Sequence, residues 1–367
     1  MKIKKRILYI IPNKFWGGGQ QYIFELSQEI KQRQLAELYY IGRKYPISQK
    51  RFSQFGPFLS LPLKSILDLY SIFRIGLLIR SKHIDIVHAH IPKDAILALL
   101  GKKLLGSKCK VIMTRHLVRP GKFNMLYRWA YKNIDKYIFV SKVAEQSFFA
   151  TAPEKVKINN CIIYNSVRGT RSSHEKLDLR SEYHLDKHTK IISFAGRIAY
   201  DKGPAVLLSA FEQSHLSDAL IFAGDIDENY RSQWEALVKE CKVRNQVFFH
   251  PYVENIYDFI RQSDILVIPS IVKEACPLIL LEAMQQAATI IATDNGAQRE
   301  LVSHEEEALL VPPDDAVALG EAIKRLLDNP QLRIALGQKA LQKSKYFSYN
   351  RFLEKMLEVY GFSADTQ

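Results

Sequence analysis

Short runs of apolar residues alternate with longer periodic stretches along the first half of the chain. The short runs are rich in β-branched and aromatic residues and nearly continuous in apolarity, as buried parallel strands are. They predict strands at residues 6–11, 37–41, 84–88, 110–114, 136–140 and 161–164. The stretches between them predict helices at residues 19–31, 64–80, 94–105, 123–132 and 141–149. Such alternation is typical of a doubly wound α/β sheet.

The same pattern restarts after a polar and charged stretch, residues 165–190, which is the best candidate for a linker. The second half predicts strands at residues 190–195, 219–223, 246–249, 265–268, 288–293 and 308–311. We therefore predict two Rossmann-like domains in tandem, at residues 1–168 and 188–348, joined by a linker at 169–187. Ligands of such sheets bind outside the carboxyl ends of the strands, so two facing domains would place the site in the cleft between them.

A last amphipathic helix is predicted at residues 350–360, within the terminal segment 349–367. Phe352, Met356 and Val359 recur on one face of it at helical spacing.

The composition is that of a globular protein, with 47% hydrophobic and 25% charged residues in a chain of 367. The four cysteines are scattered without the spacing of a metal site or a disulfide framework, which indicates a reducing compartment. The apolar run near the start is too short for a signal peptide, and no run is long enough to span a bilayer.

Positive charge is concentrated in the first half. Residues 1–180 hold 33 Lys+Arg and 11 Asp+Glu, a balance of +22, whereas residues 181–367 hold 19 and 27, a balance of −8. A basic half suggests an anionic partner such as lipid, nucleic acid or an acidic glycan. Two segments combine cations with apolar residues, 61–82 and 119–132. A core helix is favoured for the first, and the second is the better surface candidate because its four large apolar side chains do not fit one buried face.

Candidate chemistry centres on residues 264–282, where a strand, a loop with Glu274 and a helix follow one another. Pro277 suits the first turn of a helix, so the amides of Leu278 and Ile279 would point out of its start and bind phosphate. Glu274 and Glu282 could each accept hydrogen bonds from a diol. A sugar-nucleotide site and an amphipathic helix with two solvated glutamates are equally consistent with this stretch alone.

In each domain, one glycine-containing turn follows the first strand. Arg197 and Lys202, within residues 196–203, could clamp a diphosphate, and their place at a strand end favours this over a solvated basic loop. Gly18 and Gly19 could let the backbone approach a phosphate. For the turn with Gly18 and Gly19, a plain strand-to-helix connection without a ligand is equally consistent with the sequence.

Three histidines stand at strand ends. His88 and His90 are two residues apart, but no carboxylate or cysteine has matching spacing for a metal. A structural role is favoured for His88. His116 lies just past a buried strand on the side of the expected cleft and is the functional candidate. Residues 164–167 and 293–300 have the composition of turns.

Taken in order, these residues resemble the retaining glycosyltransferases of family 4, which have the GT-B fold, over nearly the whole chain from Arg6 to Tyr360. The most specific likeness is the Glu-x7-Glu motif, from Glu274 to Glu282 and on through Ala283 and Met284. The Arg197 and Lys202 pair comes next. The family's remaining positions are met by Gly18, Gly19, Gln21, Thr114, Arg115, His116, Val140, Ser141, Gly296 and Glu300.

The resemblance implies a nucleotide-diphosphate sugar donor, with a UDP-sugar expected, held mainly by the second domain. Glu274 would bond donor-sugar hydroxyls and Glu282 the ribose diol. Arg197 and Lys202 would neutralise the diphosphate. The first domain would contribute Gly18 and Gly19 to the donor phosphate and His116 to the sugar, and the last helix would cross back onto it. Transfer would retain anomeric configuration, and no divalent metal or other cofactor would be needed.

The chain also departs from the family pattern. Cys276 and Pro277 stand where many members carry an aromatic residue and a glycine, which affects donor-sugar contacts. Ser166 stands where the family usually has a glycine, and Ala297 and Gln298 stand in a turn before Glu300 that is usually rich in glycine.

We therefore expect a cytoplasmic hexosyltransferase, peripheral at the inner face of the plasma membrane, that acts on a lipid-linked, lipopolysaccharide or other cell-surface glycan. The alternatives are a GT-B sugar-nucleotide epimerase, which would turn over its donor without an acceptor, and a non-catalytic protein that binds membrane or nucleic acid. No nucleic-acid module matches, and the aromatic residues do not interleave with the basic ones. No nucleic-acid partner is therefore expected.

Overall fold

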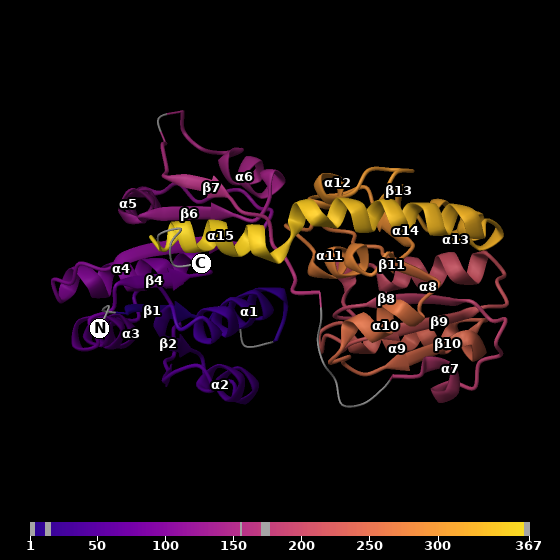
Figure 1. Ribbon diagram of the computed structural model, residues 1–367, viewed down its shortest axis with the longest axis horizontal. Coiled ribbons are helices and arrows are strands. Elements are labelled where there is room, and N and C mark those ends of the chain that lie inside the picture. The colour runs from indigo at the N-terminus through magenta and orange to yellow at the C-terminus, as the bar shows by residue number, and fades with distance from the viewer. Residues whose placement is uncertain (1–3, 12–15, 155, 170–176, 363–367) are drawn as a thin grey trace. The chain divides into compact units, whose positions relative to one another are not determined.

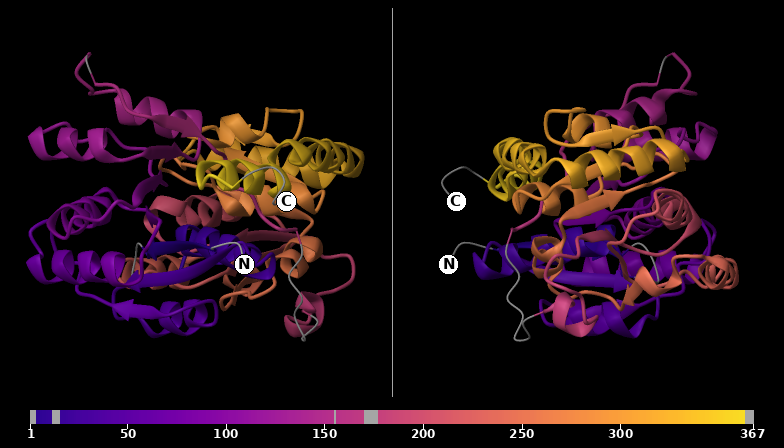
Figure 2. Two further views of the ribbon diagram at one scale, coloured as in Figure 1. Left: turned by 60° about the vertical axis from the view of Figure 1, so that its left-hand side comes forward. Right: turned by 90° about the vertical axis from the view of Figure 1, so that its right-hand side faces the viewer.

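The computed structural model describes residues 4–11, 16–154, 156–169 and 177–362 of the chain. The chain divides into two units, the first made of Met1–Ser166 with Tyr349–Gln367 and the second of Val167–Ser348. Each unit is built on its own parallel sheet with helices against it (Figure 1, Figure 2). None of the described helices is long and apolar enough to cross a membrane.

The sheet of the first unit has seven strands in the order β3-β2-β1-β4-β5-β6-β7, and all their pairings are parallel. The strands are β1 (Lys5–Ile10), β2 (Ala36–Gly42), β3 (Phe58–Ser60), β4 (Ile86–Ala89), β5 (Lys110–Arg115), β6 (Lys136–Phe139) and β7 (Asn160–Ile162). Six of them lie where an apolar run predicted a strand. The sequence did not predict β3, because this three-residue edge strand is not buried and so lacks a continuous apolar signal.

Helices cover both faces of this sheet (Figure 1). They are α1 (Gly18–Gln32), α2 (Pro46–Ser53), α3 (Leu69–Ser81), α4 (Pro92–Leu104), α5 (Met125–Asn133), α6 (Lys142–Phe149) and α15 (Tyr349–Val359). Side chains of α1, α2 and α15 join one core with side chains of the strands. Helices α3, α4 and α5 pack in sequence against one another.

Helix α3 begins five residues later than predicted, because Asp68 caps it. The Asp68 carboxylate accepts a hydrogen bond from the Ser71 amide at 3.0 Å. The helix then packs closely on α4, since a Cβ on Gly76 would lie 2.5 Å from the carbonyl oxygen of Gly101. This contact therefore requires glycine on α3.

Helix α15 packs on the first unit through residues that the sequence pattern identified only in part. Phe352 and Met356 are buried as predicted, but Val359 is only partly buried. Leu353 and Leu357 take the remaining core positions. The buried stripe is thus centred one residue away from the predicted face.

The second unit repeats the architecture with six parallel strands in the order β10-β9-β8-β11-β12-β13. They are β8 (Ile191–Ala195), β9 (Ala219–Ala223), β10 (Val247–His250), β11 (Ile265–Ile268), β12 (Ile290–Thr293) and β13 (Leu309–Val311). All six coincide with predicted strands to within two residues at either end. The predicted fold class, two Rossmann-like parallel-sheet domains, is confirmed.

The helices of the second unit are α7 (Leu179–Glu182), α8 (Pro204–Gln213), α9 (Arg231–Glu240), α10 (Ile256–Gln262), α11 (Leu278–Gln285), α12 (Gln298–Leu301), α13 (Ala316–Asp328) and α14 (Pro330–Ser344). Short 3-10 turns are η1 (Tyr200–Lys202), η2 (Arg244–Gln246) and η3 (Lys345–Phe347). Helices α8, α9, α13 and α14 contribute to one large core with the strands.

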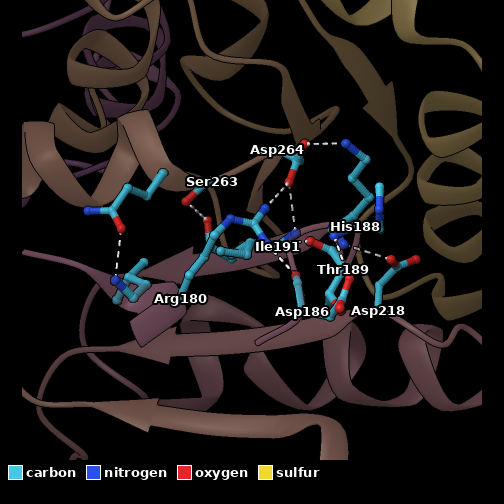
Figure 3. A network of polar contacts seen from close by, with 12 residues as sticks. Arg180, Asp186, His188, Thr189, Ile191, Asp218, Ser263 and Asp264 are labelled. Carbon is cyan, nitrogen blue, oxygen red and sulfur yellow. Dashed lines mark hydrogen bonds and ion pairs between the residues drawn. The ribbon is translucent and has the colours of Figure 1, made fainter. Parts of the chain in front are cut away.

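A polar network ties the start of this unit to the amino ends of its central strands (Figure 3). The Asp264 carboxylate, just before β11, accepts a hydrogen bond from the Ile191 amide at 3.0 Å and lies 3.7 Å from the Arg180 guanidinium. Arg180 also donates to the backbone carbonyl of Asp186 at 2.9 Å. Arg180 and Asp186 fall in the segment predicted as a linker, and these bonds hold them to the second unit.

Candidate functional site

The candidate residues of the second unit lie where its strand order reverses. Strands β8 and β11 are neighbours, but β8 leads outward to β9 whereas β11 leads outward to β12. Right-handed crossovers then carry the helices that follow these two strands to opposite faces of the sheet. Ligands of open α/β sheets bind at the carboxyl ends of the strands at such a switch point. Arg197 and Lys202 follow β8, and Glu274 follows β11.

The loop after β8 is held in place by backbone pairing and by a glycine. Ile198 continues the parallel ladder by pairing with Ile226 of the loop after β9. The loop ends at Gly203, whose φ is +68° and where a Cβ would lie 2.0 Å from the carbonyl oxygen of Pro269. Only glycine fits there. This close approach brings the loop that carries Lys202 against the loop that carries Glu274.

Arg197 is held by two carboxylates that the sequence analysis did not single out. Its guanidinium donates to both carboxylate oxygens of Asp201, at 3.0 and 3.1 Å, and to Asp227. Its side chain is 48% exposed. Five N–H groups are more than these two partners use, so the guanidinium can still donate to an anion at this edge of the sheet.

Lys202 forms an ion pair with Glu274. The same Glu274 oxygen accepts a hydrogen bond from the Ser270 hydroxyl at 2.8 Å, and only 15% of the Glu274 side chain is exposed. Two donors therefore fix one carboxylate oxygen of Glu274, which orients the carboxylate.

The backbone of Glu274 is fixed by the turn after β12. The Ala297 amide donates to the Glu274 carbonyl at 2.8 Å. A Cβ on Gly296, which has a φ of +58°, would lie 2.5 Å from that carbonyl oxygen. The sequence alone indicated only a turn here, and the fold packs this turn directly against the candidate residue.

Helix α11 supplies the remaining candidate residues of the second unit. It begins at Leu278 with Pro277 as its N-cap, so Pro277 precedes the helix instead of opening it as predicted. The N-cap provides no side-chain hydrogen bond. The first amides of α11, those of Leu278 and Ile279, have no carbonyl within the helix to bind. Glu282, one turn further on, is buried.

The first unit has its own switch point, between β1 and β4. Helix α1 follows β1 and begins at Gly18 and Gly19, with Gly17 as an N-cap that has no side chain to bind the first amides. His90 comes directly after β4. The turn between β1 and α1 includes residues 12–15, which lie outside the described residues.

Three histidines and two tyrosines form a network at this edge of the first sheet, in which His116 is partly exposed and the other four residues are buried. The two hydrogen-bonded ring nitrogens of His90 and His116 are 3.0 Å apart, and the ring of Tyr22 meets both imidazoles edge-on. His88 contacts the Tyr360 hydroxyl at 2.7 Å. The tyrosine after α15 thereby joins the strand that carries His88.

Burial keeps all three imidazoles neutral. Desolvation lowers the pKa of His116 to about 4 and, with the nearby His116, that of His88 to about 3. The pKa of His90 is held well below its usual range by burial and by the two other histidines. A neutral His116 can donate one hydrogen bond or accept one, but it does not bring a positive charge to a ligand.

The first unit is expected to lose stability as the pH falls below 6.5. A group whose pKa is lower in the folded state binds fewer protons there, so each of the three histidines lowers the unfolding free energy by up to about 1.4 kcal/mol per pH unit below its unfolded pKa. Asp94 raises the unfolding free energy as the pH falls below 6. Burial raises the pKa of its carboxyl to about 6, although the nearby Arg43 and Lys93 lower it. Urea unfolding between pH 7.5 and 4.5, followed by hydrogen exchange of the β4 and β5 amides, measures the net loss.

His88→Gln should flatten this pH dependence, since glutamine keeps polar contacts to Tyr360 but does not titrate. The exposed His188→Gln is the control and should leave it unchanged. An unaltered pH slope in His88→Gln would contradict the neutral state that burial imposes.

Sequence and structure comparisons place the chain in a family. Residues 175–365, more than half of the chain, match the family of glycosyl transferases group 1, and residues 16–167 match Glycosyltransferase Family 4. The chain is a group 1 glycosyltransferase with the GT-B fold.

Three known proteins are similar to this glycosyltransferase. An uncharacterized glycosyltransferase of Methanocaldococcus jannaschii is 27% identical over 311 residues, 82% of each chain. The N-acetyl-alpha-D-glucosaminyl L-malate synthase of Bacillus anthracis is 26% identical over 292 residues, 76% of this chain and 74% of the synthase. The crystal structure of HepE from Anabaena, in complex with UDP and glucose, superposes with a TM-score of 0.83 at 16% identity, covering 97% of this chain and 99% of HepE. At that identity the superposition shows the fold alone.

The glycosyltransferase thus brings together some candidate residues that are far apart in its sequence. Lys202 and Glu274 are in contact, and Arg197 lies on the same loop as Lys202. The sequence did not predict Asp201, Asp227 or Ser270 as parts of the site. Asp227 and Ser270 each follow a buried strand within four residues, and that position is the signal that could have found them. Among the described residues, no group of three or more His, Cys, Asp or Glu is placed to hold a metal ion.

Proposed function

We propose that this glycosyltransferase moves a hexose from a nucleotide-diphosphate sugar, with a UDP-sugar as the expected donor, to a lipid-linked, lipopolysaccharide or other cell-surface glycan. The observation that carries the donor assignment is the contact between Lys202 and Glu274 at the switch point of the second sheet, beside the loop of Arg197. Cations and a sugar-binding carboxylate stand together there. That HepE was crystallised with UDP and glucose supports the choice of base.

Each candidate residue has a proposed task in donor binding. Arg197 and Lys202 neutralise the diphosphate, and the Leu278 and Ile279 amides at the start of α11 donate to it. Glu274 accepts hydrogen bonds from the sugar hydroxyls through Oε2, because Lys202 and Ser270 both donate to its other carboxylate oxygen, Oε1. Glu282 holds the ribose diol.

The first unit has its own proposed contacts with the donor. Gly18 and Gly19 at the start of α1 let the backbone approach the donor phosphate, as exposed or half-exposed glycines can. His116, neutral and fixed by His90, contacts the donor sugar through a hydrogen bond without charge.

In the proposed reaction, the bond from the anomeric carbon to the diphosphate breaks and its electron pair goes to the phosphate oxygen. The oxygen of an acceptor hydroxyl bonds to the same carbon on the same face, and the hydroxyl proton passes to the departing phosphate oxygen, so the configuration is retained. The cations stabilise the charge that develops on the departing diphosphate. We propose that they do so without a divalent metal, and that no enzyme nucleophile forms a covalent intermediate.

The proposed acceptor and location rest on charge. Residues 1–180 carry a balance of +22, which favours an acidic glycan or an anionic membrane surface over a neutral small molecule. We therefore propose that the protein is cytoplasmic and binds peripherally at the inner face of the plasma membrane, which fits this positive charge. Membership of the family does not identify the acceptor. The relative from Bacillus anthracis, for example, is an N-acetyl-alpha-D-glucosaminyl L-malate synthase, and L-malate is not a glycan.

Donor binding is tested by a thermal-shift panel of nucleotide-diphosphate sugars, followed by mass spectrometry of the acceptor pool. We expect saturable stabilisation by one class of donor, of about 3 kcal/mol at a hundredfold excess over its Kd. Glu282→Ala should weaken this stabilisation, because it removes the proposed contact to the ribose diol. That contact is remote from bond breaking, so its loss should affect donor binding more than turnover.

EDTA should leave the transfer rate unchanged.

Two results would overturn the proposal. The absence of stabilisation by any nucleotide-diphosphate sugar would exclude the donor class. Turnover of the donor to its epimer without an acceptor would replace transfer by epimerisation.

A further inference from the structure

Large apolar side chains of the first unit gather in solvent on α3 and on the turn before it. Leu67 is 76% exposed, Leu69 75%, Tyr70 56%, Phe73 48% and Leu77 44%. Residues four apart lie above one another on a helix, so Leu69, Phe73 and Leu77 form a stripe with Tyr70 beside it. We call these five residues the α3 stripe.

The α3 stripe is not needed for the core, because α3 has a second apolar face. Ile72, Ile75 and Ile79 are buried on that face, and Gly76 meets Gly101 of α4. A helix at the surface of a globular protein normally has one apolar face, with polar residues opposite. Contiguous exposed apolar surface of this kind marks an interaction site.

Four basic residues border the α3 stripe, Lys64, Arg74, Arg80 and Lys82. Among the described residues none of the four forms a salt bridge, although Lys64 lies near enough to Asp68 to lower the pKa of that carboxyl. Arg80 follows Leu77 by three positions, which places it at the end of the stripe. Arg74 lies over the ring of Tyr70 at 5.9 Å. The nearby carboxylate of Asp68 is engaged as the helix cap.

We propose that the α3 stripe docks on an anionic lipid bilayer, with its apolar side chains in the interface and its four cations at lipid phosphates. A helix with an apolar face flanked by Lys and Arg is the form that peripheral proteins use to lie on such surfaces. The inference rests on the proposed membrane-side acceptor and names the surface that reaches it. A second copy of the chain fits less well, because a symmetric contact would bring the same cations together.

The sequence favoured the opposite assignment, with residues 61–82 as a core helix and residues 119–132 at the surface. That assignment is wrong for Tyr131, and Phe123 is only partly exposed. Tyr131 is buried, and Phe123 packs against Phe148 and Tyr131 at 5.3 and 5.8 Å between ring centroids. Among the large apolar side chains of that segment, Met125 is the most exposed, at 88%.

The α3 stripe begins at the edge of the sheet that carries the candidate histidines. Lys93, in the first turn of α4, donates to the carbonyl of Leu63 at 2.5 Å, just ahead of α3. Helix α4 starts two residues after His90, at the carboxyl end of β4. Docking through α3 would therefore hold this edge near the headgroups of lipid-linked acceptors.

Sedimentation of the full chain with vesicles tests the docking surface. Wild-type protein should bind phosphatidylcholine vesicles that contain phosphatidylglycerol and not pure phosphatidylcholine, and the binding should weaken with salt. Three variants remove matched sets of exposed side chains. The apolar variant is Leu69→Gln, Phe73→Gln and Leu77→Gln, and the charge variant is Arg74→Gln, Arg80→Gln and Lys82→Gln. The control variant is Lys122→Gln, Arg128→Gln and Lys132→Gln, which removes the same charge from around α5.

We expect the apolar variant to lose at least about tenfold in vesicle binding, at low and at high salt. The charge variant should lose more than about tenfold at low salt, since each cation near an anionic surface is worth about fivefold. The control variant should lose clearly less. Thermal stabilisation by the donor sugar, measured on the same proteins, should be unchanged in all three.

Three outcomes would overturn docking through α3. The first is full vesicle binding by the apolar variant, and the second is an equal loss of binding in the charge and control variants. The third is a wild-type protein that does not bind vesicles and is a dimer, while the apolar variant is a monomer. Because donor stabilisation is read separately, a failure of docking leaves the donor assignment standing. A lack of donor stabilisation with normal docking would instead overturn the proposed function.

Discussion

Glu274→Ala should lower the transfer rate by about a hundredfold or more while the fold remains intact. In the proposed site this carboxylate contacts the donor sugar in the transition state, and removal of one such contact typically costs two to three powers of ten. The variant also releases Lys202, which is paired to Glu274. Initial rates with donor and acceptor, at saturating and limiting donor, separate the effect on turnover from that on binding.

The fold should tolerate this change, because Lys202, the partner that it leaves unpaired, has a side chain that is 29% exposed and can be hydrated. We expect the unfolding midpoint to shift by no more than a few degrees. Glu321→Ala, at an exposed position of α13 in the same unit, is the matched control and should transfer at the wild-type rate. Near-normal turnover by purified Glu274→Ala would remove the central assignment of the site.

The fold was predictable because parallel strands buried on both faces leave continuous apolar runs in the sequence. The runs around Val267 and Ile291 have this form, and both are interior strands of the sheet. The pattern fails where burial is one-sided or absent, as at β3 and α2. It also failed for α3, where apolar residues on two faces resemble a buried helix although only one face is covered.

The candidate site was predictable only as separate positions after strands. That Lys202 meets Glu274 depends on the neighbouring placement of β8 and β11, and the two residues are 72 positions apart. Tyr360 reaches His88 across 272 positions. Such contacts follow from strand order and from the return of the last helix, which a local pattern does not encode.

Arg197→Ala and Lys202→Ala should each lower the transfer rate by about a hundredfold or more, and the double variant should lose far less than the product of the two. The structure supports a shared task, because both side chains extend from the loop after β8 that Gly203 presses against Pro269. If both cations act on one diphosphate, removing the first already weakens the contact that the second would make.

The two single variants should nevertheless differ in how they fail. Loss of Lys202 also leaves Glu274 without its ion-pair partner, so it should impair sugar positioning and lower turnover more than donor affinity. Loss of Arg197 leaves Glu274 paired with Lys202, so it should weaken donor affinity as well as turnover. Arg231→Ala, which removes an exposed arginine paired with Glu235 on α9, is the control for charge alone. A strictly multiplicative loss in the double variant, measured as kcat/KM, would show that the two cations act on different groups.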